Sequence, residues 1–326
     1  MPVAFILSPK YGSFLSKDVN ITLYAYDDNL DTARLKVDET LLALWSQAGT
    51  QTFTLSTLTV GDGVHKFTSE VLVKAGNRAE STISVIVDNT PPTAEIQQPR
   101  DGSFVSGLVL VELRAEDENF NYMELTVEGV TYKWEAKHQI FPWNTSCFVD
   151  GAHQIFLTVA DKAGNVVESW VTVKVDNTPP TINSLTWVPP QPKANETVKV
   201  YVQIADNGSG VKSATLWFKR LDDENWQKKS MNLENGNWTA TIHGFEEETT
   251  VIFYVECSDK TGNRAISPMK HYVVEAAEVV KGFEGLPLYW LAAAVFAIFA
   301  VLASTAYYLK KRKRASSAST FMVSSL

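Results

Sequence analysis

The feature that most constrains the fold is one long phrase that occurs twice in the chain. Residues 62–93 read DGVHKFTSEVLVKAGNRAESTISVIVDNTPPT, and residues 150–181 read DGAHQIFLTVADKAGNVVESWVTVKVDNTPPT, so the two copies start 88 residues apart. A period of this size, with a glycine turn at its start and a Pro-Pro pair at its end, is typical of a whole small β-domain that is repeated. The sequence therefore predicts tandem copies of one domain.

Residues after the second copy repeat the pattern more loosely. The stretches IADNGSGVKSATLWF and VECSDKTGNRAISPMKHYVV, from residue 204 onward, carry related turns and strands. Short runs rich in β-branched and aromatic residues, separated by turn signals every 8 to 12 residues, predict an all-β chain. About seven strands in about 90 residues fit an immunoglobulin-like sandwich. We expect three such domains, at residues 1–90, 91–178 and 179–275.

The phrase itself contains recognisable turns. Asp62-Gly63 and Asp150-Gly151 predict turns that lead into the next strand, and each Gly-Asn pair of the KAGN and KTGN pieces predicts a hairpin turn. The two VDNTPP joints place consecutive prolines between domains, which restricts the backbone of the prolines and of the residue before them. We therefore expect short, stiff joints and domains that line up end to end.

A transmembrane helix is predicted near the carboxyl end. Residues 286–309, LPLYWLAAAVFAIFAVLASTAYYL, contain no charged residue and are long enough to span a bilayer. Residues 276–285 read as a juxtamembrane linker, and the tail 310–326 begins with KKRKR in a chain whose net charge is −8. By the positive-inside rule this basic tail is cytoplasmic and the three domains are extracellular. The predicted location is therefore the cell membrane, crossed once, with the lipid bilayer as a partner through residues 286–309.

The amino terminus fits this topology poorly. Residues 1–14, MPVAFILSPKYGSF, contain no basic leader followed by an apolar stretch and a small-residue cleavage site. We expect either that the chain is part of a longer exported protein or that its export signal is of another kind. A tail-anchored protein with cytoplasmic domains is the competing topology, and it would put KKRKR on the wrong side of the membrane.

The repeated phrases DGAHQIFLTVADKAGN and VDNTPPT, with DGVH and KAGN in the first copy, closely resemble the Ig-like repeats of bacterial and archaeal cell-surface proteins. The resemblance covers roughly residues 1–275 and is weakest in the third domain, which lacks the DGxH turn. It implies tandem β-sandwich modules of adhesins, stalks and envelope proteins, or accessory regions of secreted enzymes. No chemistry is common to such modules.

The sequence offers no catalytic, cofactor-binding or metal site to which we commit. His65 and His153 occupy the same point of the repeat, which indicates a part in a turn rather than catalysis. No nucleophile elbow, HExxH motif, phosphate-binding glycine loop or cysteine cluster occurs in the sequence. Cys147 and Cys257 lie in different domains, so no disulfide within a domain is possible, and we expect both as small buried residues in strands.

Calcium is an alternative that the sequence leaves open. Three acidic loops follow equivalent strands, and Asp88 and Asp176 end the domains that precede the second and third of these loops. Clustered oxygen ligands are what a hard cation takes, and a junction of this kind would resemble a cadherin rod. Asp and Asn are also ordinary turn residues, and no loop has the DxDxDG spacing. The three loops are residues 27–29, 116–119 and 206–210.

Six tryptophans leave a sugar-binding surface open as a second alternative, carried mainly by the third domain. We expect Trp217 to be buried and Trp226 and Trp238 to form a cross-strand pair beside the MNLENGN hairpin. The others are Trp134, Trp143 and Trp187.

Together these patterns predict a non-enzymatic, membrane-anchored cell-surface stalk or adhesion module that binds an unidentified extracellular protein or glycan. The acidic charge argues against a nucleic-acid partner. A competing hypothesis is the carboxy-terminal spacer and anchor of a larger exported enzyme, such as a protease or glycoside hydrolase, with its catalytic domain upstream.

Overall fold

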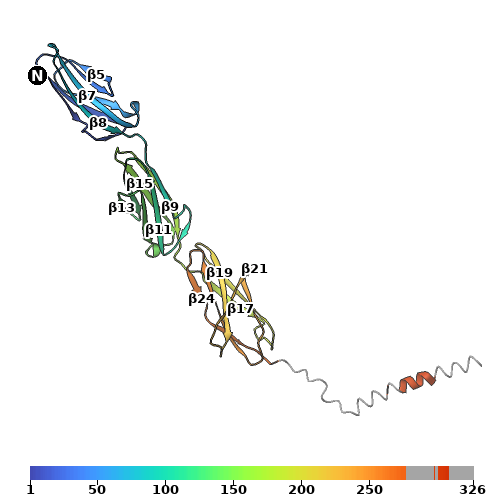
Figure 1. The fold of residues 1–326 in the computed structure, drawn as a ribbon. Helices are drawn as coiled ribbons and strands as arrows, with labels where there is room; N and C mark the ends of the chain where they lie inside the picture. Colours follow the sequence, from blue (N-terminus) through green and yellow to red (C-terminus); the bar gives the residue numbers. More distant parts are fainter. Residues whose placement is uncertain (277–296, 298–299, 308–326) are drawn as a thin grey trace, which may run out of the picture.

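The computed structural model describes residues 1–276, 297 and 300–307, and it contains three two-sheet β-sandwiches arranged one after another along an extended line (Figure 1). We name them sandwich 1 (residues 3–87), sandwich 2 (residues 93–175) and sandwich 3 (residues 181–273). The described chain is all-β in these three units, as the sequence predicts.

Sandwich 1 packs a three-stranded sheet against a five-stranded one, with a 3-10 turn η1 (Thr57–Thr59) between β6 and β7. The first sheet has the order β1 (Val3–Ser8), β3 (Asp18–Tyr26), β6 (Gly49–Ser56). The second has the order β2 (Phe14–Leu15), β8 (Arg78–Val87), β7 (Gly63–Val73), β4 (Leu30–Val37), β5 (Thr40–Trp45).

Sandwich 2 repeats this topology strand for strand, with η2 (Thr145–Cys147) at the position of η1. Its three-stranded sheet has the order β14 (His138–Asn144), β11 (Leu108–Glu116), β9 (Thr93–Gln98). Its five-stranded sheet has the order β10 (Phe104–Val105), β16 (Val166–Val175), β15 (Gly151–Asp161), β12 (Phe120–Val127), β13 (Val130–Trp134).

Sandwich 3 is a looser variant, in keeping with its weaker repeat. One sheet has the order β17 (Thr181–Val188), β18 (Val198–Ala205), β22 (Asn237–Ile242), β21 (Asn232–Glu234). The other has the order β20 (Gln227–Ser230), β19 (Val211–Arg220), β23 (Thr250–Asp259), β24 (Arg264–Ile266), and β25 (Lys270–Val273) also pairs with β23.

Alternating side chains of both sheets form a separate core in each sandwich. In sandwich 2, Val111 and Leu113 of one sheet meet Leu125 and Leu157 of the other, and all four are fully buried. Burial of a side chain of this size stabilises a domain by about 1.5–3 kcal/mol, which is the main reason the alternating pattern folds as a sandwich.

The predicted turns are confirmed. Gly63 and Gly151 both have φ of 139°, a conformation that L side chains rarely adopt, at the start of the long hairpin of each repeat. The hairpins β7–β8, β15–β16 and β23–β24 turn at the three Gly-Asn pairs.

The expectations about Cys147 and about a pair of Trp226 with Trp238 are wrong. Cys147 is exposed in η2 rather than buried in a strand, whereas Cys257 is buried in β23, and both thiols are free. Trp226 precedes β20 of one sheet and Trp238 lies on β22 of the other, where it faces Leu233, so these tryptophans form no cross-strand pair.

The predicted membrane segment lies largely outside the described residues. Residues 300–307 are helical, and no helix within the described part of the chain is long and apolar enough to cross a membrane. The linker 276–285, the span 286–309 and the tail 310–326 stay predictions.

Candidate site at the two domain junctions

The functional candidates of this chain gather where one sandwich meets the next. At the first junction, the β15–β16 hairpin of sandwich 2 reaches back to Asp88, the residue after β8, and to Ser16, the residue after β2. Asn165 Nδ2 donates a hydrogen bond to the Asp88 carbonyl oxygen (2.8 Å), and Ser16 Oγ donates one to the Ala163 carbonyl oxygen (2.8 Å). Asn165 is buried, so the hairpin acts as a clamp on the preceding domain.

The second junction repeats the clamp with equivalent residues. Asn263 Nδ2 donates to the Asp176 carbonyl oxygen (2.7 Å), while its Oδ1 accepts from Ser106 Oγ (3.0 Å). Thr261 Oγ1 adds a further bond to the same Asp176 carbonyl (3.2 Å). Because buried polar groups must find partners, these contacts hold the carbonyl of each joint in a fixed place against the next hairpin.

The joint is also tied to the domain it leaves. The Asp150 carboxylate accepts from the Asn177 backbone N–H (2.7 Å) and from Thr178 Oγ1 (2.5 Å). The hydrogen bond from the threonine hydroxyl, and after it the bond from the Asn177 N–H, hold the pKa of Asp150 below its ordinary value. Asp62 accepts equivalent bonds from Asn89 and Thr90. The Asp-Gly turn and the Asn-Thr joint, far apart in each repeat, thus form one unit.

Three aspartates gather at each junction, and one carboxylate oxygen from each lies within 4.8 Å of the other two. At each junction the first aspartate comes from the joint. The second comes from the loop after β11 or β18 of the next sandwich, and the third is the last residue of β15 or β23, the first strand of the clamp hairpin. Two of each three are buried. The clusters are Asp88, Asp117 and Asp161 at the first junction and Asp176, Asp206 and Asp259 at the second.

The structure thus brings together part of the acidic pattern seen in the sequence. Asp117 and Asp206 of the acidic loops do meet Asp88 and Asp176, whereas the loop at residues 27–29 meets no such group within the described residues. The third ligands, Asp161 and Asp259, were not assigned to the clusters by the sequence. The signal that marks them is their common place in the repeat, since each begins a D-K-x-G-N segment.

Electrostatic repulsion is visible at the first cluster. Burial of the carboxyl, followed by the negative charges of Asp88 and Asp161, raises the pKa of Asp117 above its ordinary value, although the Asn119 N–H acts in the opposite direction. Lys137 donates to the Asp117 carbonyl oxygen rather than to the carboxylate. The raised pKa of Asp117 thus has its cause in burial and in the two neighbouring carboxylates.

The repeated histidines have a structural place. His153 Nδ1 contacts Glu128 Oε1 (2.5 Å), and its Nε2 contacts the Val149 carbonyl oxygen (2.8 Å). Burial lowers the pKa of His153, but the two acceptors outweigh it and the net pKa is raised. His65 makes the equivalent contacts to Asp38 and to the Gly61 carbonyl. Both rings therefore fasten the turn before the long hairpin, as expected from their repeat position.

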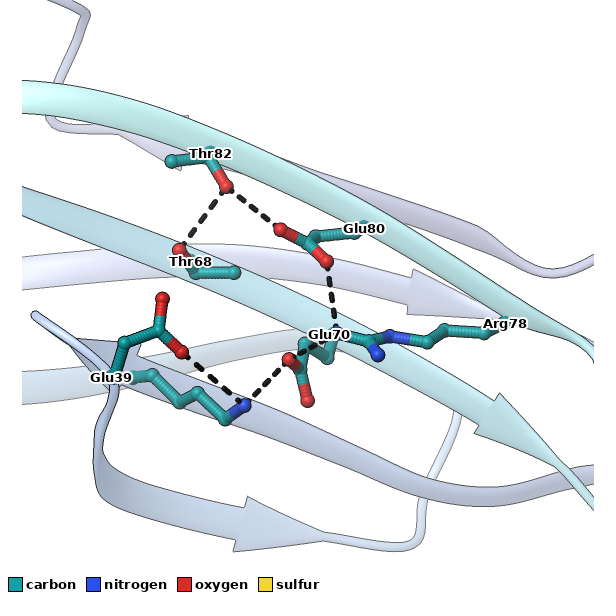
Figure 2. A network of polar contacts seen from close by, with 7 residues as sticks. Glu39, Thr68, Glu70, Arg78, Glu80 and Thr82 are labelled. Carbon is teal, nitrogen blue, oxygen red and sulfur yellow. Dashed lines mark hydrogen bonds and ion pairs between the residues drawn. The ribbon is translucent and has the colours of Figure 1, made fainter.

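Sandwich 1 carries an ion-pair network on its five-stranded sheet that sandwich 2 lacks (Figure 2). Glu70, which is 7% exposed, accepts from Lys36 Nζ (2.6 Å) and Arg78 Nη2 (2.5 Å), and Arg78 also reaches Glu80 (2.9 Å). Each acid here has a cationic partner, which makes the network a stabilising one. The junction clusters differ from it in this respect.

The tryptophans predicted as a sugar platform pack largely on other aromatic rings of their own sandwiches. Trp217 is half-buried rather than buried, its ring stacks on Tyr254 with a centroid distance of 6.1 Å, and Lys228 Nζ lies 5.5 Å from its centroid. Trp226 meets the edge of Tyr254 at 5.0 Å. Trp143 is buried in sandwich 2. The carbohydrate alternative stays a hypothesis.

No protein-family model matches the sequence, and no curated protein matches it. Solved structures do match. An I-band fragment of titin is 10% identical with a TM-score of 0.43, covering 85% of this chain and 98% of that one. The fibronectin(III)-like modules of Clostridium thermocellum CbhA are 19% identical with a TM-score of 0.37, covering 54% and 94%.

Three amino-terminal domains of the bacteriophage RB49 Highly Immunogenic Outer Capsid protein are 11% identical with a TM-score of 0.40, covering 82% of this chain and 96% of that one. At these identities the likeness concerns the fold alone. What the structure itself shows is an array of three tandem two-sheet β-sandwiches in the described chain.

Proposed function

We propose that this chain is a non-enzymatic, membrane-anchored stalk or adhesion module whose three sandwiches hold a binding surface away from the cell. The observation that carries the proposal is the pair of matching clamps, in which Asn165 and Asn263 each bond the joint of the preceding domain. A chain of freely hinged domains has no use for buried polar contacts between neighbours, whereas a spacer that must keep its length does.

Small-angle X-ray scattering on residues 1–275 tests the stalk. Sandwiches of about 35–45 Å each, from strands of about ten residues at about 3.3 Å per residue, predict a maximum dimension of about 100–130 Å. The double variant Asn165→Ala and Asn263→Ala is expected to broaden the distance distribution and shorten its mean. A compact particle for the native chain contradicts the proposal.

Anchoring and orientation need a separate test, because they depend on residues outside the described structure. We expect the full chain to stay with membranes after alkaline extraction and a chain ending at residue 285 to be released, since the span 286–309 would be missing. External protease is expected to digest the sandwiches and to spare a tag placed after residue 326. Protection of the sandwiches in intact cells would reverse the proposed orientation.

A further inference from the structure

The aspartate cluster at the second junction lacks a positive partner. Asp259 is 0% and Asp176 is 1% exposed, and neither they nor Asp206 form an ion pair with a lysine or arginine of the described residues. The Lys260 ammonium lies beside Gly210, on the rim of the loop. Bringing three carboxylates within 4.8 Å of one another in a buried place costs several kcal/mol unless a cation joins them.

One buried oxygen of this cluster has no hydrogen-bond partner among the residues that the structure describes. Asp176 Oδ2 accepts from the Ser209 N–H (2.6 Å), but Asp176 Oδ1 is fully buried with no donor, and so is the hydroxyl of Ser209. A buried carboxylate oxygen without a donor is rare in folded proteins, because the group loses its hydration with nothing in exchange. Such an atom marks a place for a ligand that supplies positive charge.

The other two carboxylates are held in position by the backbone. Asp206 Oδ1 accepts from the N–H groups of Gly208 (3.1 Å) and Gly210 (2.6 Å), and no donor among the described residues reaches its Oδ2. Within the described part of the chain, Asp259 Oδ2 accepts only from Asn263 Nδ2 (2.7 Å), which leaves a lone pair free. A Cβ at Gly208 would collide with the Asp176 carboxylate, so the loop passes directly over it.

The kind of ligands suits calcium. Ca²⁺ takes about six to eight oxygen ligands in flexible geometry, whereas Mg²⁺ demands a near-ideal octahedron and is rarely held by an all-protein set of ligands. Three carboxylates match the oxygen-rich and irregular shells that Ca²⁺ accepts. Open room for water ligands lies beside Asp176, Asp206 and Thr178.

We propose that Asp176, Asp206 and Asp259 bind one Ca²⁺ ion that joins the end of sandwich 2 to two loops of sandwich 3. The ion takes the open oxygens of Asp176 and Asp206 and the free lone pair of Asp259. It locks the second junction beside the Asn263 clamp, and the site exists whether or not the chain serves as a stalk.

The first junction has the same three acids, but the carboxylate of its joint aspartate has other hydrogen-bond partners, which makes it the matched control. Both oxygens of Asp88 already have donors, Oδ2 from Asn119 Nδ2 (2.8 Å) and Oδ1 from the Thr90 N–H (3.2 Å). Sandwich 1 has Val73 at the position of Asp161 and Asp259, with the same backbone bond to the hairpin (Val73 N–H to Asn77 carbonyl, 3.0 Å). The acid is therefore not required by the hairpin itself.

Isothermal titration calorimetry of the full chain in non-ionic detergent, stripped with EDTA and titrated with CaCl₂, tests the site. We expect one Ca²⁺ per chain with a Kd on the order of 0.1–1 mM, the range of extracellular calcium modules, and weaker binding of Mg²⁺. Asp176→Asn keeps the shape of the side chain and is expected to weaken binding at least tenfold. Asp88→Asn is expected to leave this binding unchanged.

Thermal unfolding in EDTA separates loss of the site from loss of the fold. Without metal, Asp176→Asn is expected to unfold at or above the native temperature, because it removes a buried charge, while Ca²⁺ raises the unfolding temperature of the native chain alone. If Asp176→Asn does not fold, Asp206→Asn in the half-exposed loop takes its place.

Three results overturn the proposal: no Ca²⁺ binding to the native chain at about 10 mM, far above the expected Kd; native affinity in both Asp176→Asn and Asp206→Asn; or Mg²⁺ binding as tightly as Ca²⁺. A failure of this kind leaves the scattering test of the stalk unaffected.

Discussion

Replacing Asn263 with alanine probes the clamp on which the end-to-end arrangement depends. The side chain gives one bond to the Asp176 carbonyl, accepts one from Ser106 and gives a charge-assisted one to Asp259. Net values of about 1 kcal/mol for each neutral bond and about 2 kcal/mol for the charged one set an upper range of about 4 kcal/mol. Since water replaces some of these partners, we expect a loss of about 3 kcal/mol in the local stability of the β23–β24 hairpin.

Hydrogen exchange measured by mass spectrometry reads this loss by peptide. A loss of about 3 kcal/mol corresponds to exchange on the order of 100-fold faster in the β23–β24 peptides, since each 1.4 kcal/mol is tenfold. The matched control is Asn77→Ala in the equivalent hairpin of sandwich 1, where the side chain is exposed and makes no hydrogen bond within the described residues. Equal effects of the two substitutions on their own hairpins would refute the clamp.

Three further outcomes follow from contacts within the sandwiches. The raised pKa of His153 contributes stability that is fully present below pH 6.5 and is lost as the pH rises through that pKa. An NMR titration of the ring and unfolding at each pH would detect the loss, and His153→Gln should abolish this dependence of stability on pH. Glu70→Ala is expected to lower the free energy of unfolding by about 2 kcal/mol in denaturant, whereas Glu80→Ala, at an exposed position, is expected to change it by no more than about 0.5 kcal/mol. Burial raises the pKa of Glu70, but the hydrogen bond from Lys36 and the nearby cations outweigh it, so the net pKa is lowered. The difference between the two variants should therefore vanish as the pH falls below about 4. Phe253→Ala, at a fully buried position, is expected to cost about 3–5 kcal/mol in sandwich 3, and a smaller loss would mean that this core collapses around the cavity.

The local architecture could be predicted because its causes are local. An Asp-Gly pair requires a turn wherever it stands, and alternating β-branched residues require one buried face, so the three sandwiches and their hairpins follow from the printed residues. The environment of single residues could not be predicted in this way. Cys147 was expected in a strand but lies in η2, because one turn of 3-10 helix has no periodic signature in three residues.

The clamp contacts at the junctions were beyond prediction for a different reason. Asn165 and Asp88 are 77 residues apart in the chain, and each already has a sufficient local explanation, the asparagine in a hairpin turn and the aspartate at the end of a strand. A residue that satisfies a local rule gives no sign that it also serves a distant partner. Only the relative placement of two sandwiches reveals that the turn and the joint, repeated together, are the two halves of one contact.

The repeat does contain one hint of this pairing. All three hairpins close with the same backbone bond, yet the residue that opens the hairpin is valine in sandwich 1 and aspartate in sandwiches 2 and 3. Asp161 and Asp259 each accept a hydrogen bond from the N–H group of the hairpin's own asparagine, but valine forms the same hairpin in sandwich 1, so the hairpin does not require the acid. Both acids lie close to the aspartate of the preceding joint, Asp161 to Asp88 and Asp259 to Asp176. A difference between repeat copies therefore carries information about the junction that their identity cannot, because identity reports only what every copy needs to fold.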